Sequence, residues 1–243
     1  MNLLIDIGNT RSKIAVWEGE KKLQEFNFKQ LEIDYLEKLI KYSFHIDKAI
    51  LSSVVDVDFK IINFLTNRLK NFVVLDGNTK TPIINHYRSR STLGSDRIAA
   101  VTGANYLYPG QNLLVIDSGT AITFDWVSSE AEHLGGNISP GFDMRFLALH
   151  NFTGKLPLID KCTQWDFVGN NTTSAIVAGV QNGIVFEVNG YIEYAQRNFD
   201  NFLVILTGGN IEYFVNQIKN PIFVHSDLLF VGLNRILNYN VED

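Results

Sequence analysis

Two apolar segments of the chain end in the same chemically useful residues. Residues 3–10 read "LLIDIGNT" and residues 113–120 read "LLVIDSGT", so an aspartate, a glycine and a threonine follow an apolar run twice, at Asp6 and at Asp117. Alternate residues of a strand share a face, which lets the aspartate leave the core where the strand ends. The glycine lets the backbone approach a ligand closely. The repeat therefore indicates a pair of ligand-binding turns.

The chemistry that these turns offer is that of a phosphate site. The first turn combines a carboxylate, an open backbone, hydroxyls and a cation, within Asp6, Ile7, Gly8, Asn9, Thr10, Arg11, Ser12 and Lys13. We expect it to hold phosphate oxygens, with Asp6 on a Mg²⁺ directly or through a water. Asp117, Gly119 and Thr120 repeat this set, and two such turns across a cleft would hold one polyphosphate from both sides. Hairpin chemistry alone explains either turn singly, but the matched pair favours a ligand.

The elements that must position these turns follow from the apolar pattern. Short runs rich in Val, Ile and Leu predict strands at 3–7, 12–17, 49–54, 72–75, 113–116, 122–127 and 202–206. Helical spacing marks residues 61–69, 98–107 and 229–237, which makes the chain an α/β protein. Each turn is followed by a second apolar strand ending near Trp17 or Trp126. A weaker candidate is "TGGN", Thr207–Asn210, where a strand, two glycines and an expected helix would receive a nucleotide.

The repeat also predicts the domain organisation. We expect an N-terminal lobe at 1–111, with the first hairpin, and a C-terminal lobe at 112–243, with the second hairpin and the region for adenosine. The break is expected near Tyr108–Gln111, where Pro and Gly interrupt a helical pattern. The C-terminal helix is expected to pack back on the first lobe.

Composition excludes several classes of function. The 243 residues carry a formal charge of −5 without a dense Lys/Arg run, so no nucleic-acid partner is expected. Cys162 is the only cysteine, and no apolar run approaches the roughly 18 residues of a membrane span. We therefore expect a soluble cytoplasmic protein that does not bind membranes. The sequence contains neither a G-x-x-x-x-G-K-[ST] loop nor a G-x-G-x-x-G turn after a strand, so a phosphate site must use another scheme.

Paired acidic hairpins belong to the two-lobed ATPase fold of sugar kinases, acetate kinase, actin and the heat-shock chaperone ATPases. Within that fold the chain resembles the type III pantothenate kinases through five segments in order: "IDIGNTRSK", "GSDRIAAVTGA", "VIDSGTAITFD", "GGNISPGF" and "GNNTTSAIVAGV". The resemblance implies two related ribonuclease H-like lobes with a nucleotide cleft between them. It implies transfer of the ATP γ-phosphoryl group to the primary hydroxyl of pantothenate, the first step towards coenzyme A. It further implies Mg²⁺, a monovalent cation (K⁺ or ammonium) and a homodimer with the active site near the subunit interface.

The resemblance also assigns residues. It implies that Asp96 is the catalytic base and that Asp117 binds the monovalent cation. It implies that Thr120, like the first turn, contacts ATP. Pantothenate would be bound by Tyr87, Gly94, Ser95, Asp96, Arg97 and Thr172. The "GGNISPGF" segment, 135–142, is expected to close part of the cleft, although turn chemistry explains it equally well.

Several alternatives stay open from the sequence. Taken alone, Ser95 and Asp96 before an apolar helical stripe are also typical of a helix N-cap. Arg90 stands where family members often have Pro, which bears on the shape of the substrate loop. The competing functions are an actin- or chaperone-type ATP-driven switch, a catalytically silent regulatory relative, and a kinase for another small alcohol.

Overall fold

The chain folds into two compact units, each built around its own sheet. The computed structural model describes residues 1–43 and 45–241. Unit 1 comprises Met1–Pro109, Ala131–His133 and the residues from Asp227 onwards, and unit 2 comprises Gly110–Glu130 and Leu134–Ser226. The chain therefore leaves unit 1, builds unit 2, and returns to unit 1 with its last helix.

Unit 1 contains a five-stranded sheet in the order β3-β2-β1-β4-β5. Strand β1 pairs antiparallel with β2 and parallel with β4, and β4 pairs parallel with β5. The strands are β1 Asn2–Ile7, β2 Ser12–Glu18, β3 Lys21–Phe28, β4 Lys48–Ser53 and β5 Asn71–Val74. The helices are α1 Ile33–Lys38, which continues as a π-helix at Leu39–Ser43, α2 Phe59–Arg68, α3 Ser95–Leu107 and α6 Leu228–Val241, with a 3-10 turn at Arg90–Thr92.

The two faces of this sheet bury different side chains because strand residues alternate. Leu3 and Ile5 of β1 belong to the core that contains residues of α1 and α2, whereas Leu4 belongs to the core that contains residues of α3 and α6. By the same alternation, Asp6 lies on the face of Leu4, at the end of the strand. The apolar pattern of β1 thus directs its one carboxylate towards α3.

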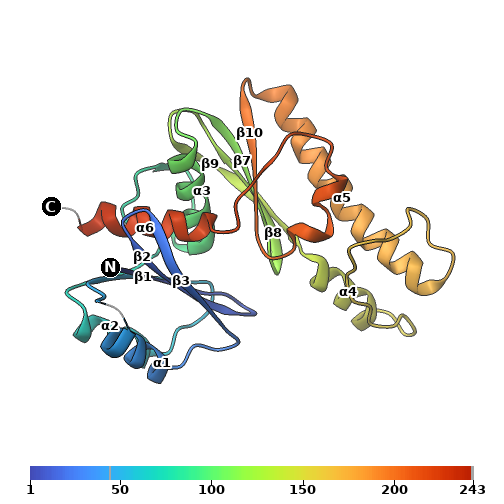
Figure 1. Ribbon diagram of the computed structural model, residues 1–243. Helices are drawn as coiled ribbons and strands as arrows, with labels where there is room; N and C mark the ends of the chain where they lie inside the picture. Colours follow the sequence, from blue (N-terminus) through green and yellow to red (C-terminus); the bar gives the residue numbers. More distant parts are fainter. Residues whose placement is uncertain (44, 242–243) are drawn as a thin grey trace. The chain divides into compact units, whose positions relative to one another are not determined.

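Helices α3 and α6 pack closely against each other, as Figure 1 shows. A Cβ on Gly232 would lie 1.8 Å from the carbonyl oxygen of Ala99, and one on Gly103 would lie 2.3 Å from that of Leu228. Glycine at these two positions lets the helix backbones approach more closely than any side chain would allow. The resulting contact fixes α3 over the sheet.

Unit 2 repeats the strand order of unit 1. Its sheet runs β9-β8-β7-β10-β11, with β7 antiparallel to β8 and parallel to β10, as β1 is to β2 and β4. The elements are β7 Asn112–Ser118, β8 Ala121–Val127, β9 Glu132–Pro140, α4 Phe142–Asn151, α5 Thr172–Asn198, β10 Phe202–Thr207 and β11 Phe223–Val224. The first two residues of β9 belong to unit 1 and pair there with β6, Ile84–Asn85. This repeat confirms the prediction of an α/β protein with two related halves.

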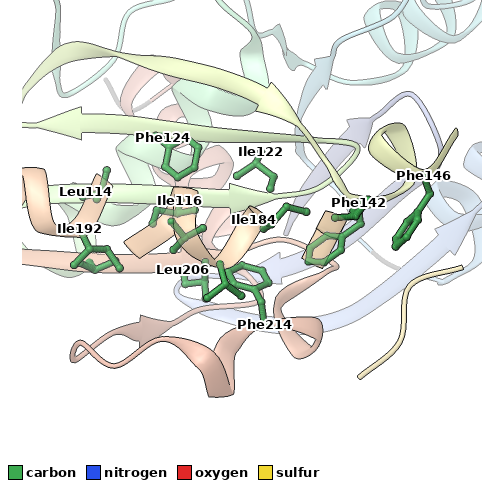
Figure 2. Close-up of a cluster of buried hydrophobic side chains, with 14 of the residues drawn as sticks. Leu114, Ile116, Ile122, Phe124, Phe142, Phe146, Ile184, Ile192, Leu206 and Phe214 are labelled. Atoms are coloured by element: carbon green, nitrogen blue, oxygen red, sulfur yellow. The ribbon is translucent and has the colours of Figure 1, made fainter. Parts of the chain in front are cut away.

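The core of unit 2 lies between its sheet and α5. Figure 2 shows Leu114, Ile116 and Leu206 from the sheet gathered with Ile184 and Ile192 of α5. Four aromatic side chains complete this cluster, namely Phe124, Phe142, Phe146 and Phe214. Because Ile116 faces this core, Asp117 faces the opposite side of the sheet.

The helix expected after "TGGN" does not form. Thr207 ends β10, and two short 3-10 turns follow, at Ile211–Tyr213 and Val215–Gln217. Phe214, between the turns, is 1% exposed and belongs to the core of unit 2, and Pro221 interrupts any longer helix. The expected site at a helix N-terminus is therefore wrong. Among the described residues, no helix is long and apolar enough to cross a membrane.

Candidate active site

Asp6 is the centre of a polar cluster at the end of β1. In register it lies opposite Lys13 on β2 and opposite Ser52 on β4, so the three side chains share one face of the sheet. Ser52 Oγ donates a hydrogen bond of 3.1 Å to Asp6 Oδ1. The apolar strand therefore ends in a carboxylate held by a hydroxyl, with an ammonium group on the neighbouring strand.

The negative charge of Asp6 is energetically unfavourable in the protein without bound ligands. Burial, and after it the negative charge of Asp96, raise the pKa of Asp6 to about 6, although the Ser52 hydrogen bond and Lys13 oppose that rise. A carboxylate whose charge is penalised in this way gains free energy when a cation binds beside it. Asp6 is thus suited by its surroundings to meet a metal ion.

A set of serine hydroxyls connects Asp6 to helix α3. Ser95, the first residue of α3, is 4% exposed, and its Oγ lies 3.0 Å from Ser52 Oγ. The same Oγ donates to the carbonyl oxygen of Ser53 and accepts from the Ser53 N–H, both at 3.0 Å. The N-terminus of α3 is therefore bound to the end of β4 directly beside Asp6. Ser95, which the sequence assigned to substrate contact, makes its described hydrogen bonds within the protein.

Asp96 is the second residue of α3, and its position depends on Gly94. A Cβ on Gly94 would lie 2.4 Å from Asp96 Oδ1, and this same oxygen accepts a 2.8 Å hydrogen bond from the Arg97 N–H. The N-cap of α3 is Gly94, without a side-chain capping bond. Capping by Ser95 or Asp96 is thus excluded, and the glycine leaves the space that the carboxylate occupies.

An aromatic and cationic stack adjoins Asp96. The Arg97 guanidinium carbon lies 5.2 Å from the centroid of the Tyr87 ring, and this ring stacks on His133 with centroids 6.3 Å apart. Arg97 and His133 are both buried, at 4% and 1% exposure. The Tyr87 N–H donates to Asn85 Oδ1 at 2.9 Å. The structure therefore brings together two residues that the sequence assigned to substrate binding, Tyr87 and Arg97, and Asp96 directly precedes Arg97 in the chain.

Arg90, which occupies the position where Pro is common, belongs to the same loop. Its guanidinium donates a 3.1 Å hydrogen bond to the carbonyl oxygen of Asn85. Asn85 thus bonds both to Arg90 and to the backbone of Tyr87. Arg90 supports the loop with a side-chain contact that proline would not supply.

The first hairpin turn presents only part of the predicted phosphate set. The Gly8 N–H donates to the Arg11 carbonyl oxygen at 3.0 Å, which closes the turn and occupies that donor. Asn9, Thr10 and Arg11 are exposed at its tip. Ser12 is 3% exposed and, by strand alternation, lies on the opposite face of the sheet from Asp6 and Lys13. Its hydroxyl therefore does not join the Asp6 cluster.

A second cluster surrounds Asp117 in unit 2. A Cβ on Gly208, whose φ is +104°, would lie 2.5 Å from both Asp117 Oδ1 and the Ser118 carbonyl oxygen. Asn210 holds this turn in place, because its backbone N–H donates to the Ser118 carbonyl and its side-chain amide to that of Gly119. A carboxylate oxygen and a carbonyl oxygen thus lie so close to the backbone of residue 208 that any side chain there would collide with them.

The remaining predicted residues of unit 2 also lie at element ends. The carbonyl oxygen of Thr120 accepts a 3.1 Å hydrogen bond from the N–H of Gly141, which is the N-cap of α4. The "GGNISPGF" segment is therefore the end of β9 and the start of α4 rather than a free turn. Thr172 is exposed as the first residue of α5, after a capping box formed by Asn171 and Ser174.

The donor sets fit the ions that the sequence implies. Mg²⁺ in phosphoryl-transfer sites is held by one or two carboxylates together with phosphates and waters, and Asp6 is such a carboxylate. In the described part of the chain, no group of three His, Cys, Asp or Glu could hold a metal alone. The Asp117 carboxylate and the Ser118 carbonyl beside Gly208 are oxygen donors of the kind that hold a monovalent cation.

The paired sheets and the aspartates at their strand ends define a protein of the actin-like ATPase and sugar-kinase fold. The activator of 2-hydroxyisocaproyl-CoA dehydratase from Clostridium difficile, with bound ADPNP, has a similar structure, with a TM-score of 0.55 and 15% identity. The match covers 98% of this chain and 93% of the activator. A glucokinase from an Antarctic psychrotroph matches over 98% of both chains, with a TM-score of 0.58 and 10% identity. At these identities the likeness shows the fold alone.

Sequence comparison narrows this class to one family. Residues 2–194 match the family described as type III pantothenate kinase. A type III pantothenate kinase of Bacteroides fragilis is 41% identical over 240 residues, which are 99% of this chain and 98% of the relative. One of Flavobacterium johnsoniae is 37% identical over 244 residues and covers both chains completely. The chain belongs to the type III pantothenate kinase family.

The family confirms the predicted activity. The protein is an ATP-dependent kinase that phosphorylates pantothenate in the biosynthesis of coenzyme A. The polar clusters around Asp6 and around Asp117 contain its candidate active-site residues.

Sequence reasoning missed two residues of unit 1 that contact candidate site residues. Ser52 contacts Asp6, and His133 stacks on Tyr87. The Ser-Ser pair that ends β4 was a signal for the first, since parallel strands bring their carboxyl ends to one edge of a sheet. His133 had no such signal, because its contact with Tyr87 depends on the pairing of β6 with β9.

Proposed function

We propose that Asp96 is the general base of this kinase and accepts the proton of the pantothenate hydroxyl as its oxygen bonds to the γ-phosphorus. The observation that carries this proposal is that the start of α3 lies beside Asp6: Ser52 Oγ contacts both Asp6 Oδ1, at 3.1 Å, and the Oγ of Ser95, which directly precedes Asp96, at 3.0 Å. In agreement with this, the charge of Asp96 contributes to the raised pKa of Asp6. Asp6 is suited to the metal of Mg·ATP, and Asp96, on the adjacent helix N-terminus, to the acceptor alcohol. General-base assistance of this kind contributes about 10²–10⁴-fold to a rate.

Substrate binding follows from the groups around Asp96. Gly94, Ser95 and Arg97 flank the proposed base in the chain, Tyr87 contacts Arg97, and these four residues would orient pantothenate. In unit 2, the exposed Thr172 is the residue that the family resemblance assigns to pantothenate. Lys13 and the exposed tip of the first turn would contact the phosphates, and Mg²⁺, when bound, would neutralise their developing charge. Asp117 would hold K⁺ or ammonium, and Thr120 would contact ATP.

The base assignment is tested by an ADP-release assay with Mg·ATP, with and without pantothenate, on the wild type and Asp96→Asn. We expect turnover to require pantothenate and to fall about 100-fold or more in the variant. Asp34, an exposed aspartate in the first turn of α1, provides the matched control, and Asp34→Asn should keep full activity. Full turnover in Asp96→Asn would remove Asp96 from the base role while leaving the kinase activity intact.

We also propose that the protein is a homodimer that acts in the cytoplasm, where its single thiol stays reduced. Phe167 and Phe186 of unit 2 are 69% and 58% exposed and contact each other edge to face, and Val168 beside them is 75% exposed. Exposed apolar groups of this kind mark interaction surfaces. Phe186→Glu should halve the mass measured by light scattering. Phe59→Glu, at a 68% exposed phenylalanine of unit 1, should not.

A further inference from the structure

The hydroxyl of Ser52 contacts both the Asp6 carboxylate and the residue that precedes Asp96. Ser52 is fully buried, and its Oγ is 3.1 Å from Asp6 Oδ1 and 3.0 Å from Ser95 Oγ. Ser95 is followed directly by Asp96. The side chain of the proposed metal ligand, Asp6, is therefore connected to the first residue of the helix that carries the proposed base through the Ser52 hydroxyl.

The number of protons available decides which groups donate and which accept in these contacts. A serine hydroxyl donates one hydrogen bond and accepts up to two. The carboxylate of Asp6 is a pure acceptor when ionised, so Ser52 donates to it. Ser95 Oγ accepts from the Ser53 N–H and donates its one proton to the Ser53 carbonyl, so the 3.0 Å contact with Ser52 Oγ shares that proton. The two hydroxyls thus link the end of β4 and the start of α3 to Asp6.

We propose that Ser52 is a positioning residue of the phosphoryl transfer: it holds Asp6 at a fixed separation from the first turn of α3, and hence from Asp96. This inference rests on the roles proposed above for Asp6 and Asp96. Both hydroxyls are buried and satisfied within the protein, so the separation is set before any ligand arrives. Phosphoryl transfer depends mainly on such positioning, and small displacements reduce it strongly.

Ser52→Ala tests the role. We expect kcat to fall about tenfold or more, because a charge-assisted hydrogen bond to Asp6 is lost. The affinity for Mg²⁺ with a non-hydrolysable ATP analogue, measured by calorimetry, should fall about fivefold or more for the same reason. The KM for pantothenate should stay within about twofold, because Ser52 is fully buried and is not among the residues proposed to bind pantothenate. Ser52→Thr, which restores a hydroxyl, should recover both quantities in part.

Thr102→Val is the matched control for losing a buried hydroxyl. Thr102 lies in α3, is fully buried, and donates only to the Ile98 carbonyl one turn earlier. Its replacement should lower the unfolding temperature as Ser52→Ala does, with kcat and analogue affinity unchanged. If Ser52→Ala also lost only stability, Ser52 would be structural and the proposal would be overturned.

Ser95→Ala decides the question even if Ser52→Ala does not fold. It removes the contacts of the Ser95 hydroxyl with Ser52 and with the Ser53 backbone but leaves Ser52 free to donate to Asp6, so kcat should fall while analogue affinity is kept. Unchanged kcat in Ser95→Ala would overturn the inference. Failure of the proposed base role is seen separately, as full turnover in Asp96→Asn.

Discussion

The hairpins β1–β2 and β7–β8 share one backbone plan but surround their aspartates differently. Asp6 faces Ser52 on its parallel neighbour, and Asp117 faces Thr207 at the matching register. Beyond that point β4 continues into a second serine, Ser53, whereas β10 is followed by Gly208, whose missing side chain lets Asp117 Oδ1 and the Ser118 carbonyl oxygen lie close to the backbone. The first arrangement suits a small divalent ion that travels with phosphates, and the second suits a larger monovalent ion. Residues on the neighbouring parallel strand thus distinguish two otherwise equivalent turns.

The turns also differ in length. The first closes between the Gly8 N–H and the Arg11 carbonyl, and the second between the Gly119 N–H and the Ala121 carbonyl, each at 3.0 Å. The longer turn therefore exposes more residues at its tip. We therefore expect the first hairpin to make most of the phosphate contacts.

The largest expected effect tests the role that we propose for Asp6 in meeting Mg²⁺. Asp6→Asn keeps the size of the side chain and an acceptor for Ser52 but removes the charge that would meet Mg²⁺. We expect kcat to fall about 1000-fold, equivalent to about 4 kcal/mol, with a higher Mg²⁺ concentration for half-maximal rate. Steady-state kinetics over a Mg²⁺ series measures both. An unchanged Mg²⁺ requirement would show that Asp6 does not meet the metal.

The same aspartate should leave a signature on stability in the absence of ligands. Its pKa is raised to about 6 from 3.8, so between about pH 4 and pH 6 the folded protein keeps a proton that the unfolded chain has released. The free energy of unfolding therefore falls as pH rises through this window, by up to about 3 kcal/mol, and the penalty persists above it. Urea unfolding across this range should show a shallower fall in Asp6→Asn, which should be more stable than the wild type at pH 7. Parallel pH profiles for the two proteins would contradict this account.

One glycine in a helix of each unit differs in how closely its surroundings are packed. A Cβ on Gly232 in α6 would collide with the backbone of α3, whereas one on Gly190 in α5 would meet nothing within 4 Å. Gly232→Ala should cost about 2 kcal/mol through overpacking, and Gly190→Ala should add up to about 1 kcal/mol through helix propensity. Thermal unfolding checks both signs, and a stabilised Gly232→Ala would show that the helices separate easily.

The smallest expected effect belongs to Asp117. Asp117→Asn should abolish stimulation by K⁺ or ammonium and lower kcat about tenfold, equivalent to about 1.4 kcal/mol, while leaving the Mg²⁺ requirement unchanged. Titration of each cation at saturating substrates measures this. If Asp117→Asn changed the Mg²⁺ requirement instead, the two hairpins would not differ as proposed.

Local patterns in the sequence were sufficient to predict the strands of both hairpins. Runs of Val, Ile and Leu ended by Asp and Gly predicted strands at 3–7 and 113–116, and the structure has β1 at Asn2–Ile7 and β7 at Asn112–Ser118. Helix α5 was not predicted, although it is 27 residues long. Three glycines lower its intrinsic preference, at 179, 183 and 190, and its stability comes from packing on the sheet, which no local pattern reports.

In the candidate site, too, some residues could be predicted from local sequence patterns and others could not. Asp6 and Asp96 stand in motifs that a reader of the sequence can find. Ser52 becomes part of the site only through the register of β1 with β4, and Ser12 leaves it through strand alternation. Registers between distant segments are set by the buried faces of the whole sheet, so they are not visible in a single stretch of sequence.

The return of the last helix to unit 1 has a consequence for biosynthesis. Helix α6 contacts α3 through Gly232 and Gly103, and Asn2 at the start of β1 donates to Asn234 of α6. On the ribosome, α6 is made after every residue of unit 2. Unit 2 can therefore acquire its core while unit 1 still lacks the cover of α3. The helix that carries Asp96, α3, can therefore gain its partner α6 only after all of unit 2 has been synthesised.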